Sequence, residues 1–157
     1  MACDIKIMNT NKLNKRYIIV IIVILFVWIN SILPSNVSSE QSGFFTKILS
    51  NILDALKANY EPSRVSVFIR KLAHFTEFFL LGLSVMYAEH FKFNRKYILH
   101  IGIVVAFIDE SIQFFVPGRN MATLDIFIDY CGYMLALGIV YLTKFIKEKR
   151  GCNEMKI

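Results

Sequence analysis

Four long apolar runs constrain this chain more than any other feature of its sequence. They cover residues 17–33, 65–88, 97–116 and 124–146, and a helix needs roughly 17–25 such residues to cross a membrane. The runs show neither the alternation of strands nor dense turn residues, so helices are predicted. Hydrophobic residues make up 55% of the chain, against roughly 45–50% in soluble domains. The sequence therefore predicts an all-α fold, an integral membrane bundle of four transmembrane helices.

The segment between the first two runs carries an amphipathic pattern of its own. Its apolar residues recur at helical spacing, with polar residues on the opposite face. The apolar set is Phe44, Phe45, Ile48, Leu49, Ile52, Leu53 and Leu56. We predict a helix over about residues 43–59 in the first extracytoplasmic loop. It either packs on the rim of the bundle or lies in the outer leaflet, and the second is favoured because a small bundle offers little surface to cover it.

Basic residues predict how the bundle is oriented. They gather before the first run, between the second and third, and at or after the end of the fourth, and Lys and Arg mark cytoplasmic segments. These residues are Lys6, Lys12, Lys15, Arg16, Lys92, Arg95, Lys96, Lys144, Lys147, Lys149, Arg150 and Lys156. The chain is therefore predicted to consist of a basic cytoplasmic N-terminus (1–16), a membrane domain (17–146) and a basic cytoplasmic tail (147–157). The net charge of +6 is explained this way, so no nucleic-acid partner is predicted.

The first run has a second interpretation, as a cleaved signal peptide. A basic start, an apolar core and the small residues Val37, Ser38 and Ser39 fit that pattern. Retention as an anchor is favoured because the run reaches spanning length without help. Cleavage would leave the orientation of the other three spans unchanged.

Ionisable and amide side chains interrupt the last three runs at one depth. In the predicted orientation they lie in the outer halves of these helices or in the turn before the last one. Each charge at the membrane centre costs about 2.5–3.5 kcal/mol, so such residues usually face the bundle interior and mark a functional site. The candidate cluster is Arg70, Lys71, His74, Glu77, Asp109, Glu110, Gln113, Arg119, Asp125 and Asp129. A structural ion-pair network between the helices is the alternative.

Helical spacing places members of this cluster on shared helix faces. His74 and Glu77 lie on one face of the second run, and Asp109 and Gln113 share a face of the third run, one turn apart. Asp125 and Asp129 are one turn apart in the fourth run, and Gly132 continues their face. A glycine there is predicted to let another helix approach closely.

The cluster contains more carboxylates than cations. The cations are Arg70, Lys71 and Arg119, and the carboxylates are Glu77, Asp109, Glu110, Asp125 and Asp129. Because like charges so close cannot all stay ionised, we expect a protonated carboxyl, a charged His74 or a bound cationic group.

Sequence patterns of familiar catalytic and metal sites are missing. His74 is the only histidine in the polar layer and no HExxH pattern occurs, so neither a metal nor another cofactor is predicted. The cysteines Cys3, Cys131 and Cys152 are scattered and form no CxxC pair. No GxSxG motif supports nucleophilic hydrolysis.

Three ordered motifs carry a resemblance to a known family. They are "RKLAHFTEFFLLG" (70–82), "DESIQFFVPGR" (109–119) and "TLDIFIDYCGY" (123–133). Together, within about residues 64–146, they resemble the VanZ-like family of small bacterial membrane proteins. The family's characteristic polar residues would here be Arg70, Lys71, His74, Glu77, Asp109, Glu110, Gln113, Arg119 and Asp125. Asp129 departs from the family, which tends to have asparagine there.

The resemblance implies a bacterial cytoplasmic membrane protein acting in the cell envelope, or in resistance to teicoplanin-type glycopeptides, with which the founding member is associated. The first hypothesis is binding of a membrane lipid, a lipid-linked envelope precursor or a lipoglycopeptide. In that hypothesis Arg70, Lys71 and Arg119 contact phosphate or carboxylate.

The second hypothesis is an intramembrane enzyme acting on a lipid-linked substrate, and the sequence leaves open whether a reaction is catalysed. Acid–base chemistry would fall to His74 and Glu77, or to the pair Asp109 and Glu110. A proton-coupled carrier is disfavoured because the cytoplasmic halves of the helices are nearly free of charge. Such a carrier would need a homo-oligomer, which the sequence permits.

Overall fold

The computed structural model describes residues 10–88, 95–119 and 122–154, and every regular element in these ranges is an α-helix. The elements are α1 (Thr10–Ile32), α2 (Ser35–Ala55), α3 (Pro62–Ala88), α4 (Arg95–Phe114) and α5 (Thr123–Glu154). The predicted all-helical class is confirmed. Among the basic residues used for orientation, Lys6, Lys92 and Lys156 lie outside the described residues.

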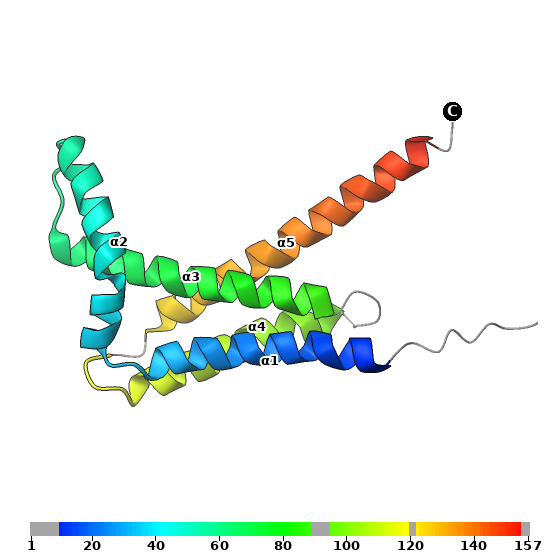
Figure 1. Cartoon of the computed structure of the whole chain (residues 1–157), viewed down its shortest axis with the longest axis horizontal. Helices are drawn as coiled ribbons and strands as arrows, with labels where there is room; N and C mark the ends of the chain where they lie inside the picture. Colours follow the sequence, from blue (N-terminus) through cyan, green and yellow to red (C-terminus); the bar gives the residue numbers. More distant parts are fainter. Residues whose placement is uncertain (1–9, 89–94, 120–121, 155–157) are drawn as a thin grey trace, which may run out of the picture.

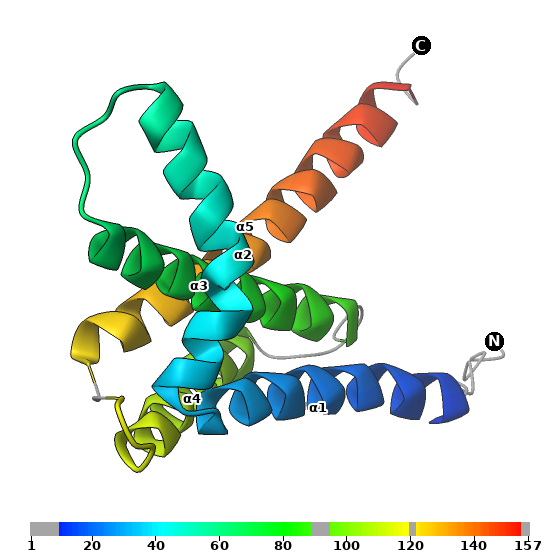
Figure 2. The same cartoon turned by 60° about the vertical axis from the view of Figure 1, so that its left-hand side comes forward.

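The third helix is the centre of the arrangement, because α3 contacts each of the other four helices. In Figure 1, α1, α3 and α4 lie along the long axis of the molecule, while α5 slants away and α2 stands across one end. Figure 2 shows the same crossing of α3 by α2 and α5 from another side. The buried core is built from α3 residues such as Phe78 and Leu81, with Val27 of α1 and Tyr133 of α5. The helix richest in polar site residues is thus also the best packed one.

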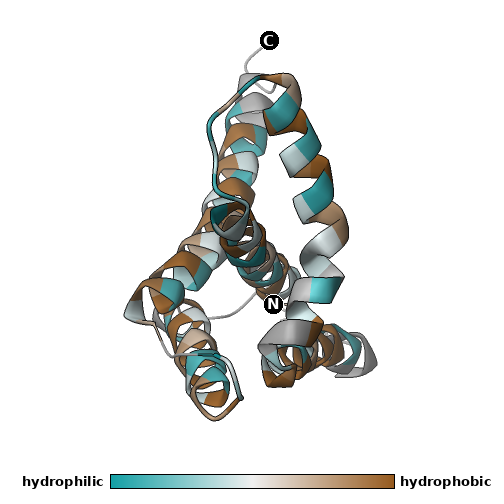
Figure 3. Cartoon of the chain, turned by 90° about the vertical axis from the view of Figure 1, so that its left-hand side faces the viewer, coloured by the Kyte–Doolittle hydropathy of each residue, from teal (hydrophilic) through white to brown (hydrophobic). Residues whose placement is uncertain are grey.

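Three of the described helices are long and apolar enough to cross a membrane. The segments are Lys15–Ile32, Tyr97–Phe114 and Thr123–Lys149. Large apolar side chains such as Ile22 and Phe107 are more than half exposed on the helix surfaces, and Figure 3 shows hydrophobic segments, in brown, on the helices between more polar ones. Exposed apolar area on this scale is typical of contact with lipid or with a partner. These features indicate a membrane protein.

The ionisable residues of α3 set it apart from these three segments. At 27 residues it has the required length. Arg70, Lys71, His74 and Glu77 lower its hydropathy, and it is not among the segments that qualify by composition. A fourth membrane span over α3 therefore stays a prediction.

The segment after α1 turns at a proline. Pro34 precedes the first residue of α2, where a proline fits because the first helical turn has no need of its missing N–H. The helix starts at Ser35, earlier than the predicted start at about residue 43. The prediction missed this start because residues 35–42 are polar apart from Val37 and show no apolar stripe. It ends at Ala55, and Lys57 adopts a left-handed backbone with φ of 52° that turns the chain toward α3.

Two glycines let α3 and α5 touch along their backbones. A Cβ atom on Gly132 would collide with the carbonyl oxygen of Phe75, and one on Gly82 would lie 2.7 Å from the carbonyl oxygen of Tyr133. The close approach predicted for Gly132 is confirmed. Because Phe75 follows His74, and Asp129 is less than one turn before Gly132, this contact brings the side chains of His74 and Asp129 toward each other.

Candidate functional site

The ten candidate residues fall into three groups in the structure. His74, Glu77, Asp109, Gln113 and Asp129 form a largely buried centre between α1, α3, α4 and α5. Lys71 and Asp125 form an ion pair nearer the surface, and Glu110 binds backbone. Arg70 and Arg119 line two cavities that lead to the centre.

Asp109 on α4 is fully buried and held from two sides. The hydroxyl of Ser31 donates a hydrogen bond of 2.6 Å to its Oδ1 atom, and Nε2 of Gln113 donates one of 2.9 Å to Oδ2. Gln113 lies one turn after Asp109, which is the spacing that predicted a shared face. Ser31 comes from α1 and was not among the candidates. The signal for it was the interruption of the first apolar run by Asn30 and Ser31.

Glu77 on α3 is also held by α1. The Nδ2 atom of Asn30 donates a hydrogen bond of 2.8 Å to Glu77 Oε1. The other carboxylate oxygen, Oε2, lies 3.6 Å from Nδ1 of His74, which is too long for a hydrogen bond. Both Glu77 Oε2 and His74 Nδ1 are buried and have no hydrogen-bond partner in residues 10–88, 95–119 and 122–154.

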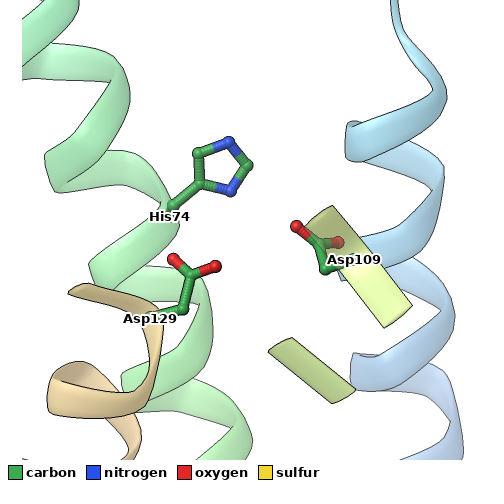
Figure 4. A group of neighbouring side chains, drawn as sticks. All are labelled: His74, Asp109 and Asp129. Atoms are coloured by element: carbon green, nitrogen blue, oxygen red, sulfur yellow. The ribbon is translucent and has the colours of Figure 1, made fainter. Parts of the chain in front are cut away.

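Within the described part of the chain, Asp129 on α5 has no hydrogen bond to either of its carboxylate oxygens, although the residue is only 1% exposed. Its side chain points toward those of His74 and Asp109 (Figure 4). Ligand atoms of these three residues all lie within 4.8 Å of one another. A buried carboxylate without a partner is costly, so this arrangement calls for a proton or a cation between the three groups.

Glu110 and the Lys71–Asp125 pair connect helices at the edge of the centre. The Oε2 atom of Glu110 accepts a hydrogen bond of 3.1 Å from the backbone N–H of Ala122, which fixes the start of α5 against α4. Lys71 of α3 binds Asp125 of α5 through its ammonium group. Both contacts connect one helix to another. The Lys71–Asp125 pair is the kind of contact expected under the alternative interpretation of the cluster, a structural ion-pair network between the helices.

Two cavities run from the surface to His74. One of about 270 Å³ is lined by Lys71, Gln113 and Asp125, among others. A smaller one of about 140 Å³ is lined by Asn30, Glu77 and residues of α2. His74, Arg70 and Arg119 line both. Cations therefore flank both cavities. His74 lines the walls of both, and Glu77 lines the smaller one.

Arg119 lies in the turn between α4 and α5, and its guanidinium group has unpaired donors among the described residues. Its Nε and Nη1 atoms are buried without a hydrogen-bond partner among the residues that the structure describes. Burial lowers the pKa of the Arg119 guanidinium from its ordinary value, and the nearby charge of Arg70 acts in the same direction. A guanidinium with open donors beside a second cation is a site suited to an anion.

One comparison with known proteins gives a match. The family model described as VanZ/LLP1 matches residues 17–144, a range that includes all ten candidate residues together with Asn30 and Ser31. Neither the curated proteins nor the solved structures gave a match.

Proposed function

Because this chain belongs to the VanZ/LLP1 family, we propose that it is an envelope protein of the bacterial cytoplasmic membrane whose polar site binds an anionic group of a lipid-linked or lipidated ligand. The ligand class comprises membrane lipids, lipid-linked envelope precursors and lipoglycopeptides of the teicoplanin type. Binding of the last class would connect the protein to glycopeptide resistance.

In this proposal α1, α3, α4 and α5 all cross the membrane, and both termini are cytoplasmic. The ends of α3 and α4 that face the 88–95 link lie toward one end of the molecule, together with the start of α1 (Figure 1). The α2 helix and the turn between α4 and α5 lie at the opposite end. The basic segments belong to the first of these ends, which supports a cytoplasmic placement for it.

The α2 helix lies on the outer leaflet in this arrangement. Phe44, Phe45, Ile52 and Leu56 expose half or more of their surface. Such a helix buries its apolar face at the boundary between headgroups and acyl chains. It stands beside the smaller cavity, to which it contributes Ser38, Ser42 and Phe45, so a ligand held in the leaflet has access to the site.

The observation that carries the proposal is the open guanidinium of Arg119. Its two buried nitrogens lack acceptors, and Arg70 lines the same two cavities. Phosphate and carboxylate groups bind guanidinium through paired, charge-assisted hydrogen bonds. An anion between Arg70 and Arg119 would also remove the repulsion between two like charges in a site of low dielectric.

The direct test measures binding by purified protein in lipid nanodiscs. The probes are polyprenyl phosphate, the lipid-linked peptidoglycan precursor and teicoplanin, each compared with a neutral polyprenol. We expect Arg119→Gln to weaken binding of the responsive anionic probe by about 10–100-fold, which corresponds to the loss of a hydrogen bond to a charged group. Arg64→Gln is the matched control, because Arg64 is exposed and paired with Glu61. Equal affinity for polyprenol and its phosphate would reject the proposal.

A cellular test uses strains with and without the gene, and a strain that carries Glu77→Gln. Lipid composition and susceptibility to lipoglycopeptides are measured in all three. A change that the wild-type gene restores and the Glu77→Gln variant does not would support a functional site. No change in either measurement would leave the polar cluster with a structural role only.

An intramembrane acid–base enzyme is the second candidate. Its support is the pair His74 Nδ1 and Glu77 Oε2, which lie 3.6 Å apart in the wall of the smaller cavity, each without a hydrogen-bond partner among the described residues. In an enzyme, His74→Gln abolishes turnover of the lipid-linked probe while binding persists. A binding protein shows no turnover of the probe in the wild type.

A further inference from the structure

We propose that His74, Asp109 and Asp129 together bind one divalent metal ion, of the class that accepts mixed imidazole and carboxylate ligands, such as Zn²⁺ or Mn²⁺. Because the three residues come from three different helices, α3, α4 and α5, no short sequence motif identifies the site. It is distinct from the cations Arg70 and Arg119, and it does not rest on the proposed function.

The positions of the ligand atoms fit a metal ion. An imidazole nitrogen of His74 and one carboxylate oxygen of each aspartate lie within 4.8 Å of one another. Ligands of Zn²⁺ lie about 2.0–2.2 Å from the ion, so two ligand atoms on opposite sides of it are up to about 4 Å apart. Small side-chain rotations close this gap. Figure 4 shows the three side chains turned toward a common space.

Unsatisfied groups give the second, independent reason. Asp129 is 1% exposed and neither of its oxygens has a hydrogen bond. His74 Nδ1 and Glu77 Oε2 are also buried without a hydrogen-bond partner. Buried polar atoms in proteins are paired in the great majority of cases, so such a concentration of open atoms needs a specific explanation. A bound cation satisfies the oxygens of Asp129 and a nitrogen of His74 together.

The third ligand is already held in place. Asp109 accepts hydrogen bonds from Ser31 and Gln113, and each oxygen keeps a further lone pair. Carboxylates that bind metals are usually oriented by such outer partners, whose loss typically costs about 10–100-fold in affinity. Ser31 and Gln113 therefore act as positioning residues for this site.

Charge and ligand type select the kind of ion. Two carboxylates and a neutral imidazole carry two negative charges, which a divalent ion cancels in a region where uncompensated charge is costly. Imidazole suits Zn²⁺, whereas carboxylates also suit Mn²⁺ and Mg²⁺. Three protein ligands leave a position open for water or another ligand.

Asp129 supplies one of the two negative charges of the site, whereas an asparagine at this position supplies no charge. The substitution Asp129→Asn is therefore the sharpest test, because it changes the charge of the site with almost no change in shape.

The experiment uses the full chain without an affinity tag, in nanodiscs, with its three cysteines replaced by serine so that no thiolate binds metal. After chelation, the protein is dialysed against Zn²⁺, Mn²⁺ or Mg²⁺, and the bound metal is measured by mass spectrometry. We expect one Zn²⁺ or Mn²⁺ per chain, with Mg²⁺ bound more weakly. Asp129→Asn and His74→Gln are expected to weaken binding by at least about 10-fold, and Ser31→Ala by about 10-fold.

Asp125→Asn is the matched control, because this carboxylate binds Lys71 outside the three-residue cluster. Its metal uptake is expected to equal that of the wild type. Electron spin echo spectroscopy of the Mn²⁺ form should show coupling between the ion and a nitrogen nucleus. This coupling should be lost in the His74→Gln variant. The proposal is overturned if the wild-type protein, shown to be helical and monodisperse, does not bind one metal ion per chain. That result is expected if the three groups share a proton instead of a metal ion. The proposal is also overturned if Asp129→Asn binds metal like the wild type.

Discussion

Two neighbouring side chains at the end of α1 hold the buried acids of other helices. Ser31 donates to Asp109 and Asn30 donates to Glu77. Ser31→Ala removes the donor of a buried carboxylate, so we expect a loss of about 1–3 kcal/mol in unfolding free energy. The measurement is reversible unfolding of the purified protein in mixed micelles, followed by circular dichroism.

Ser111→Ala is the control for this loss, because its hydroxyl binds the carbonyl oxygen of Phe107 in its own helix. We expect it to change stability by less than about 0.5 kcal/mol, as for most exposed positions. Equal effects of the two serine substitutions would contradict the importance of the Ser31 hydrogen bond.

Two substitutions of Glu110 test whether this residue acts as a hydrogen-bond acceptor or through its charge. Its oxygen accepts the backbone N–H of Ala122, and the amide oxygen of a glutamine can do the same. We therefore expect Glu110→Gln to retain near-normal stability, while Glu110→Ala loses about 1–3 kcal/mol. Unfolding in the same micelles measures both. A large loss in the glutamine variant would show that the charge, and not the acceptor, matters.

At the scale of helices, the contact between α3 and α5 sets the geometry of the centre. A methyl group at position 132 meets the backbone carbonyl of Phe75, which has little freedom to move. We expect Gly132→Ala to destabilise the protein by roughly 1–3 kcal/mol, the usual range for overpacking. The separation of His74 from Asp129 should increase with it, so metal uptake should fall as well. Thermal unfolding and bound metal are the two measurements.

Gly138→Ala in the same helix provides the comparison. Nothing lies within 4 Å of a Cβ atom at this position, and alanine favours a helix over glycine by about 1 kcal/mol. This variant should be as stable as the wild type or slightly more so. If both alanine variants behaved alike, the close contact of the two helices would not control the site.

Much of the helical content could be predicted from the sequence, because apolar runs and helical spacing are local properties. Helical spacing predicted that Asp109 and Gln113 share a face, and they are hydrogen-bonded. Which helices meet is not a local property. For that reason Asn30 and Ser31 were missed as partners, and Glu110 was grouped with residues whose contacts differ from its own. The early start of α2 was missed because its first residues carry no apolar stripe.

At the scale of the whole molecule, the orientation in the membrane is open to a direct measurement. In a cysteine-free background, single cysteines replace Lys47 on α2 and Lys147 on α5, and intact cells are treated with a membrane-impermeant maleimide. The positive-inside rule leads us to expect labelling at position 47 and none at position 147 until the cells are broken. Labelling of position 147 in intact cells would reverse the proposed topology and place the polar site at the cytoplasmic face.

Retention of the first helix is a second property of the whole molecule. Val27 and Ser31 of α1 are completely buried against other helices, so removal of α1 would expose their partners. We expect the protein isolated from membranes with a C-terminal epitope to have the mass of the full chain. A product that lacks the chain up to about Ser39 would identify α1 as part of a cleaved signal peptide.

The hydrogen bonds from α1 to α3 and α4 also impose an order on biosynthesis. Chains are made from the N-terminus, so Asn30 and Ser31 leave the ribosome well before Glu77 and Asp109 exist. If α1 enters the bilayer at once, these two side chains have no acceptors there until Glu77 and Asp109 are inserted. The translocation channel, or an insertion chaperone, would then have to keep α1 close by until the later helices arrive. In the proposed arrangement of four spans, the helices are thus expected to leave that machinery together as one assembled unit.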